Sequence, residues 1–236
     1  MDGFMSAKLL ERFNGSQIVG SYDKNILCLA DGIDPEQCIF LDCDMNRYNF
    51  VSLGNHMRLL EDSMSYKSFN PNVHFGVTTY SDKFPFATAF LISFATEVQT
   101  STTDLIRMAF ADSTLRNMEK YSNNMRNWSD RMDHPAVRYI MDNSDIAKQN
   151  DAEARFEYVD QSFTSKRYGK ERYLDTLNKA LEAQGMKFQP LTRGSKYLCD
   201  KVGLNTLTRY NKDIISYAEI FTGEYSVTYD EVAPWN

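Results

Sequence analysis

The 236-residue chain has few of the residues from which zinc sites are commonly built. It contains three histidines and four cysteines, and no two cysteines form a C-x-x-C pair. Structural zinc sites need Cys and His at ligand spacing, which these residues do not show. Three of the four cysteines lie in apolar or strand-like runs, which predicts buried free thiols. Free thiols favour a reducing compartment, either the cytoplasm or an assembled particle.

The sequence also lacks a secretion signal and a long apolar run. The first twenty residues carry four charged side chains and no uninterrupted apolar core. The longest apolar segment, 84–98, contains polar residues and is shorter than the roughly 20 residues that cross a bilayer. We expect it to form a buried helix and expect no membrane span.

Basic charge is not in excess. The chain has 26 Lys and Arg residues and 32 Asp and Glu residues, which gives a formal net charge of −6. Affinity for nucleic acid comes largely from neutralising phosphates, so nucleic acid is not the expected partner. A phosphate loop, a nucleophile elbow and a dinucleotide fingerprint are missing too. The sequence therefore predicts a non-enzymatic structural or interaction subunit without a cofactor, which binds other protein subunits in an assembly such as a virion or phage particle.

Aromatic residues are plentiful, with 14 Tyr and 15 Phe. Together with 42% hydrophobic and 25% charged residues, they indicate an ordinary globular protein with a sizeable core. Aromatic side chains fit a core and a contact surface equally well, so their number alone does not choose between these uses.

The predicted fold class is α+β, with short antiparallel strands in the N-terminal third packed against a mostly helical C-terminal two-thirds. Alternating or β-branched runs predict strands at 17–22, 25–30, 38–53 and 73–80. Three- and four-residue apolar spacing predicts helices at 53–66, 84–98, 101–128, 135–147, 173–184 and 207–221. A composition shift near residue 81 divides a β-rich part, 1–80, from a mainly helical part with an extended tail, 81–236. We expect one continuous globular unit.

The segment 38–53 carries the strongest candidate site. An apolar run ends at Asp42 and Asp44, and a second strand-like run follows. Asp and Asn tolerate turn geometry, so the simpler interpretation is a hairpin. The alternative is a metal-dependent hydrolase or transferase, because a strand ending in Asp-x-Asp can present two carboxylates to Mg²⁺ or Mn²⁺.

Three further residues could join such a metal site, namely Asp130, Asp133 and His134. Their position has a simpler explanation, in which Asp133 caps a helix that Pro135 opens. His56 lies beside the apolar face of the predicted helix 53–66, where a partly buried, hydrogen-bonded histidine is the expected state.

Residues 197–211 have the outline of a helix-turn-helix, with Gly203 at the turn. This second alternative predicts DNA binding through Lys201, Arg209 and Lys212.

The C-terminal residues Tyr225, Val227 and Tyr229 alternate with small polar residues, which predicts a strand. This strand can add to the chain's own sheet, or it can cross to a neighbouring subunit. In the second case it forms an interface with Trp235 as an anchor.

Overall fold

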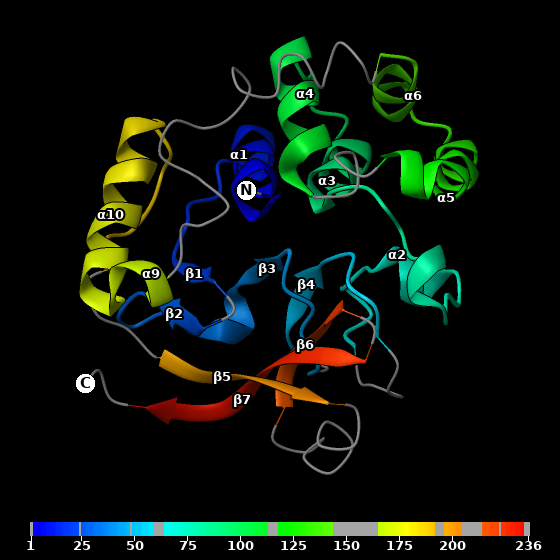
Figure 1. Ribbon diagram of the computed structural model, residues 1–236. Helices are drawn as coiled ribbons and strands as arrows, with labels where there is room; N and C mark the ends of the chain where they lie inside the picture. Colours follow the sequence, from blue (N-terminus) through cyan, green and yellow to red (C-terminus); the bar gives the residue numbers. More distant parts are fainter. Residues whose placement is uncertain are drawn as a thin grey trace.

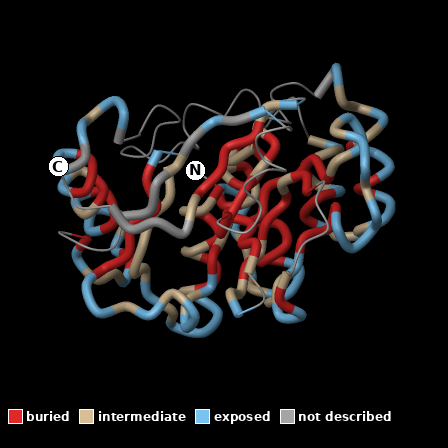
Figure 2. Tube along the Cα trace, turned by 90° about the horizontal axis from the view of Figure 1, so that it is seen from below, coloured by how far each residue is buried: buried red, intermediate tan, exposed pale blue. Residues whose placement is uncertain are grey.

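The computed structural model describes residues 2–23, 25–47, 49–58, 64–112, 118–143, 165–191, 196–203, 214–221 and 223–233. Over these residues the fold combines helices with short strands, as the α+β prediction requires. Figure 1 shows most of the helices on one side of the strands. Buried segments run through the middle of the molecule and exposed ones lie at its periphery (Figure 2).

The larger sheet has five strands in the order β1-β2-β5-β7-β6, and all neighbours are antiparallel. The strands are β1 (Gly20–Tyr22), β2 (Ile26–Leu29), β5 (Lys196–Gly203), β6 (Ile214–Phe221) and β7 (Glu224–Ala233). The predicted hairpin at 17–30 is therefore present as β1 and β2. The prediction that the strands lie in the N-terminal third is only partly correct, because β5, β6 and β7 come from the end of the chain.

The remaining two strands, β3 (Ile39–Leu41) and β4 (Val51–Leu53), pair in parallel. The predicted hairpin at 38–53 is thus wrong in its direction. Within the intervening segment, Met45 bridges Ser216 of β6, and the backbone N–H of Asn46 donates to the carbonyl of Ile215 at 2.6 Å. Because the connection pairs with β6 before it returns, β4 runs in the same direction as β3.

The main helices are α1 (Asp2–Asn14), α3 (Thr88–Thr96), α4 (Thr102–Ala111), α5 (Met118–Met132), α6 (Pro135–Asp142) and α10 (Lys170–Ala183). Shorter turns are α2 (Pro71–His74), α9 (Ser165–Tyr168), η1 (Pro35–Gln37) and η2 (Tyr80–Asp82). The predicted helices at 84–98, 135–147 and 173–184 are confirmed within the described residues. The predicted helix at 101–128 is divided, because α4 ends at Ala111 with an extended Asp112 and α5 begins at Met118. In those residues, no helix is both long enough and apolar enough to cross a membrane.

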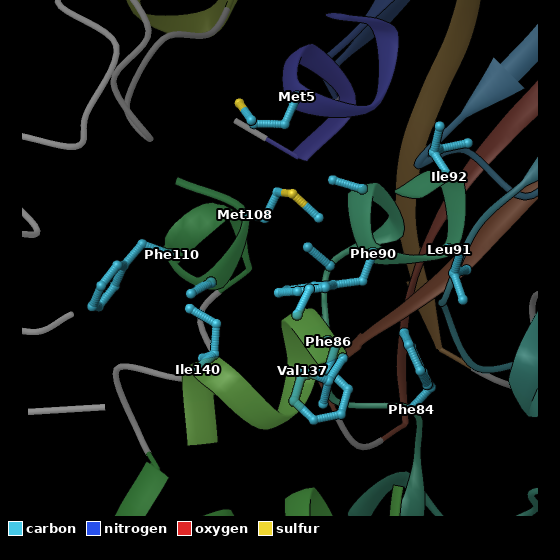
Figure 3. Close-up of a cluster of buried hydrophobic side chains, with 14 of the residues drawn as sticks. Met5, Phe84, Phe86, Phe90, Leu91, Ile92, Met108, Phe110, Val137 and Ile140 are labelled. Carbon is cyan, nitrogen blue, oxygen red and sulfur yellow. The ribbon is translucent and has the colours of Figure 1, made fainter. Parts of the chain in front are cut away.

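Helix α3 lies at the centre of the largest core cluster, and its residues from Thr88 to Ser93 are all buried. Figure 3 shows Met5, Phe90 and Met108 converging from α1, α3 and α4. Met5 and Phe90 are completely buried, so α1 is part of the core. A second cluster joins β2 to α10.

Two segments on either side of residue 70 differ from the prediction: the strand expected at 73–80 and the helix expected at 53–66. The segment 73–80 begins with the end of α2 instead of a strand, because Asn70 caps this turn and Pro71 occupies its first position. Residues 54–58 are not helical, although 53–66 has helical spacing. Their polar groups bond to Asp44 and to the segment around Asn72, which overrides the local periodicity.

The helix-turn-helix prediction is wrong, because β5 and β6 are strands. Residues 196–203 pair with β2 and β7, and 214–221 pair with β7. Both segments contain aromatic and β-branched residues, which favour strands. Because they pair with distant strands, they do not form the helices that their apolar spacing predicted. The C-terminal strand β7 has β5 on one side and β6 on the other, so it belongs to the chain's own sheet.

Candidate functional site

Asp44 lies beyond the carboxyl end of β3, and its side chain is completely buried. Its Oδ2 accepts hydrogen bonds from the backbone N–H of His56 at 3.2 Å and from the His56 ring Nδ1 at 2.9 Å. Its Oδ1 accepts from the side-chain amide of Asn70 at 2.7 Å. Gly54 packs directly against this carboxylate, since a Cβ at position 54 would lie 2.3 Å from Oδ2. Asp44 is therefore a fixed hub that holds two distant segments together.

The charges of this hub stabilise each other. Burial alone would raise the pKa of Asp44, but the hydrogen bond and charge of His56 and the charge of Arg58 lower it below its ordinary value. Burial would likewise lower the pKa of His56, yet its bond to Asp44 and the charges of Asp42 and Asp44 raise it above 6.5. Both shifts favour an imidazolium paired with a carboxylate.

Asp42 lies on the other side of the His56 ring. Its Oδ1 is 3.8 Å from His56 Nε2, and its side chain is 31% exposed. The φ angle of Asp42 is +57°, in the left-handed region, which costs about 1–2 kcal/mol for a residue with a Cβ. Residues in such conformations are concentrated at functional sites. The two predicted carboxylates thus flank one histidine, and only Asp44 is completely buried.

A cavity of about 960 Å³ opens beside this histidine and is lined in part by Asp2, Asp42, His56, Lys83 and Asp112. Asp2 is buried and accepts from the backbone N–H groups of Thr88 at 2.6 Å and Ala89 at 3.0 Å, at the start of α3. Burial and the charges of Asp42 and Asp112 raise the pKa of Asp2 to about 7.

Two buried asparagines connect the hub to the α2 turn. The Asn70 side chain accepts from the backbone N–H of Asn72 at 2.8 Å and so caps α2. The Asn72 side chain donates to the carbonyl of Asn55 at 2.7 Å and accepts from the backbone N–H of Phe84 at 2.6 Å. We call Asp44, Asn55, His56, Asn70 and Asn72 the Asp44 network. Buried networks whose polar groups are satisfied hold their surroundings in one arrangement.

The α2 turn presents exposed apolar side chains next to this network. Phe69 is 37% exposed, Val73 44% and Phe75 51%, and His74 is exposed between them. The Arg131 guanidinium lies over the Phe75 ring, 5.6 Å from its centroid. We call Phe69, Val73, His74, Phe75 and Arg131 the aromatic face.

Ring contacts join the aromatic face to the core. The Phe75 ring meets the ring of the buried Trp128 at 5.4 Å, and Trp128 in turn meets Phe84 at 5.2 Å. Contacts continue from Phe84 to Phe86 and from Phe86 to Phe90, at 5.6 and 5.8 Å. The Trp128 indole also donates to the carbonyl of Asp82 at 2.9 Å. The exposed rings are thus held by the core.

The other predicted metal ligands lie elsewhere in the fold. Asp133 has a φ of +49° and pairs with Arg138. His134, not Asp133, caps α6, because its Nδ1 accepts from the backbone N–H of Ala136 at 3.1 Å. Asp130 lies on α5 and is exposed. Across the described part of the chain, no group of three or more His, Cys, Asp or Glu residues is arranged to hold a metal ion.

The predicted nucleic-acid and interface residues have different surroundings. Lys201 lies on β5 and pairs with Glu224 at 3.6 Å, while Arg209 and Lys212 fall outside the described residues. Tyr225 and Val227 are buried in a core cluster of this chain, with Tyr229 packed against it. Trp235 is outside the described residues. The burial of Tyr225 and Val227 removes these two residues from any surface for a partner.

The sequence pointed to Asp42 and Asp44 as site residues, but it did not predict the hydrogen bonds that His56 and Asn70 donate to Asp44. The available signal was Asn70-Pro71-Asn72, a helix-start pattern that also brings two amide side chains close together.

Comparison with known proteins gives no relative: no family model, no curated protein and no solved structure matches this chain.

Proposed function

We propose that this protein is a non-enzymatic subunit of a larger assembly and that it binds a neighbouring protein subunit through the aromatic face. The observation that carries the proposal is the continuous series of ring contacts from exposed Phe75 through Trp128 into the core. Contiguous exposed apolar side chains in a soluble fold mark interaction surfaces. Aromatic residues and arginine are also the residue types that dominate binding energy at interfaces.

Two properties of the aromatic face support this proposal, namely its residue types and the fixed positions of its side chains. Binding costs less when the contacting side chains are already ordered. The aromatic face is ordered by the ring contact of Phe75 with Trp128 and by hydrogen bonds of Asn70, which caps the α2 turn, and of Asn72 within it. Arg131 adds a positive charge beside the rings, so the complementary surface would offer an apolar pocket with a carboxylate at its edge.

The chemistry of the cysteines fits an assembly in a reducing compartment. None of the four cysteines forms a disulfide bond, and burial raises the pKa of Cys28 to about 11 and that of Cys43 to about 12. Thiols with raised pKa values are poor nucleophiles, so they suit packing better than catalysis.

The test is the native mass and stoichiometry of the protein isolated from its natural source. We expect a species that contains other protein subunits in fixed ratio to this chain. A monomer, recovered alone under conditions that preserve known assemblies from the same source, would contradict the proposal.

A further inference from the structure

His56 Nε2 and Asp42 Oδ1 place a donor and an acceptor side by side at the edge of the cavity. His56 Nε2 and Asp42 Oδ1 are 3.8 Å apart, which is too far for a direct hydrogen bond. An oxygen atom at about 2.8 Å from both atoms completes two hydrogen bonds. A hydroxyl group matches this arrangement because it accepts one hydrogen bond and donates another.

The His56 ring and the Asp42 backbone are held in place by hydrogen bonds. Asp44 holds the His56 ring through Nδ1, so Nε2 is directed away from that buried carboxylate. The Asp42 backbone N–H donates to the carbonyl of Leu53 at 2.9 Å, which extends the β3–β4 pairing to this residue. Side-chain exposures of 17% for His56 and 31% for Asp42 leave both in reach of the cavity that they line.

The surrounding charges are mixed. Carboxyl groups of Asp2, Asp42 and Asp112 line this part of the cavity, together with Lys83 and His56. Because the lining carries charges of both signs, an anionic or a cationic ligand would meet repulsion from one set of groups as well as attraction to the other. A neutral ligand avoids this repulsion.

We propose that His56 and Asp42 form a binding site for a neutral hydroxyl-bearing ligand, such as a saccharide or a polyol. One ligand hydroxyl accepts from His56 Nε2 and donates to Asp42 Oδ1, and the rest of the ligand occupies the cavity. The site is separate from the aromatic face, so it stands independently of the proposed subunit contact.

The experiment follows the histidine ring signals by NMR during titration with glucose, galactose, N-acetylglucosamine, glycerol or myo-inositol. The chain has only three histidines, and His56→Gln and His74→Gln assign their ring signals. Probe concentrations up to about 50 mM reveal dissociation constants in the millimolar range. We expect at least one probe to shift the His56 signals saturably and to leave those of His74 and His134 unchanged.

The deciding variant is Asp42→Gly, which removes the carboxylate and suits the left-handed backbone at this position. It should weaken binding of the active probe at least tenfold, while Asp31→Gly, at an exposed loop position, should bind as the wild type does. Thermal melting of both variants shows whether they are folded. No shift with any probe in the wild type, or an unchanged titration in folded Asp42→Gly, would overturn the proposal.

Discussion

The side chain of Asn70 donates a 2.7 Å hydrogen bond to the buried carboxylate of Asp44, across 26 positions of sequence. Asn70 also caps the α2 turn, which carries Val73 and His74 of the aromatic face. The position of this exposed surface therefore depends on a completely buried aspartate. This connection leads to separate tests of the network and of the surface.

Replacement of Asp44 by Ala should destabilise the protein by about 3–5 kcal/mol, because it breaks a buried ion pair with His56 and removes the acceptor of its ring Nδ1 and of one hydrogen bond from the Asn70 amide. Urea unfolding measures the loss. Asp31→Ala, at an exposed position, is the matched control and should change the free energy of unfolding by less than about 0.5 kcal/mol. Equal effects of the two substitutions would contradict the role given to Asp44.

Gly54→Ala should be destabilising by about 1–3 kcal/mol or more, because the new Cβ would lie within 2.6 Å of three atoms of the Asp44 carboxylate group. Gly203→Ala is the control, since a Cβ at that position meets nothing within 4 Å. The loss should be smaller when Gly54→Ala is made together with Asp44→Ala, because the two residues are in contact. Strict additivity of the two substitutions would argue against this close packing.

Stability should fall as the pH rises above neutrality. The pKa of His56 is raised, so its contribution is fully present below 6.5 and is lost as the pH rises through the raised value. The pKa of Asp2 is raised from 3.8 to about 7, so its contribution is likewise lost as the pH rises through that range. Melting temperatures measured from about pH 5 to about pH 9 should show this decline.

At low pH, by contrast, the stability should fall as the pH decreases. The pKa of Asp44 is lowered, so its contribution is present above 3.8 and is lost as the pH falls through the lowered value. His56→Gln should reduce the loss of stability above neutrality, and Asp2→Asn should reduce the loss between about pH 4 and about pH 7. A wild-type melting temperature that is flat or rises between about pH 6 and about pH 8 would contradict these assignments.

Local signals predicted where α4 and α6 begin. Ser101, where the predicted helix 101–128 begins, caps α4, and its side chain accepts from the backbone N–H of Asp104 at 3.1 Å. Pro135 opens α6 as expected, although the cap is one residue later than predicted. Both features depend on neighbours within a few positions, which the sequence shows directly.

The sheet and the site depend on partners that are distant in the sequence. Cys28 of β2 lies opposite Lys196 of β5, and no local pattern in either segment indicates the other. In the same way, Asp44 stands out as a carboxylate after an apolar run, but nothing near it identifies Asn70 as a donor. His56 is expected to be hydrogen-bonded, but the helical spacing at 53–66 gives no indication that its backbone and ring both bond to Asp44.

The central claim is tested most directly by the native mass of complexes that form with Phe75→Ser in the natural source. Phe13→Ser is the matched control, because Phe13 is 54% exposed and Phe75 is 51% exposed. We expect Phe75→Ser to keep a near-native melting temperature and to be recovered as free monomer, while Phe13→Ser is recovered in the assembly. Incorporation of Phe75→Ser at the wild-type stoichiometry would contradict the claim that the aromatic face binds a neighbouring subunit.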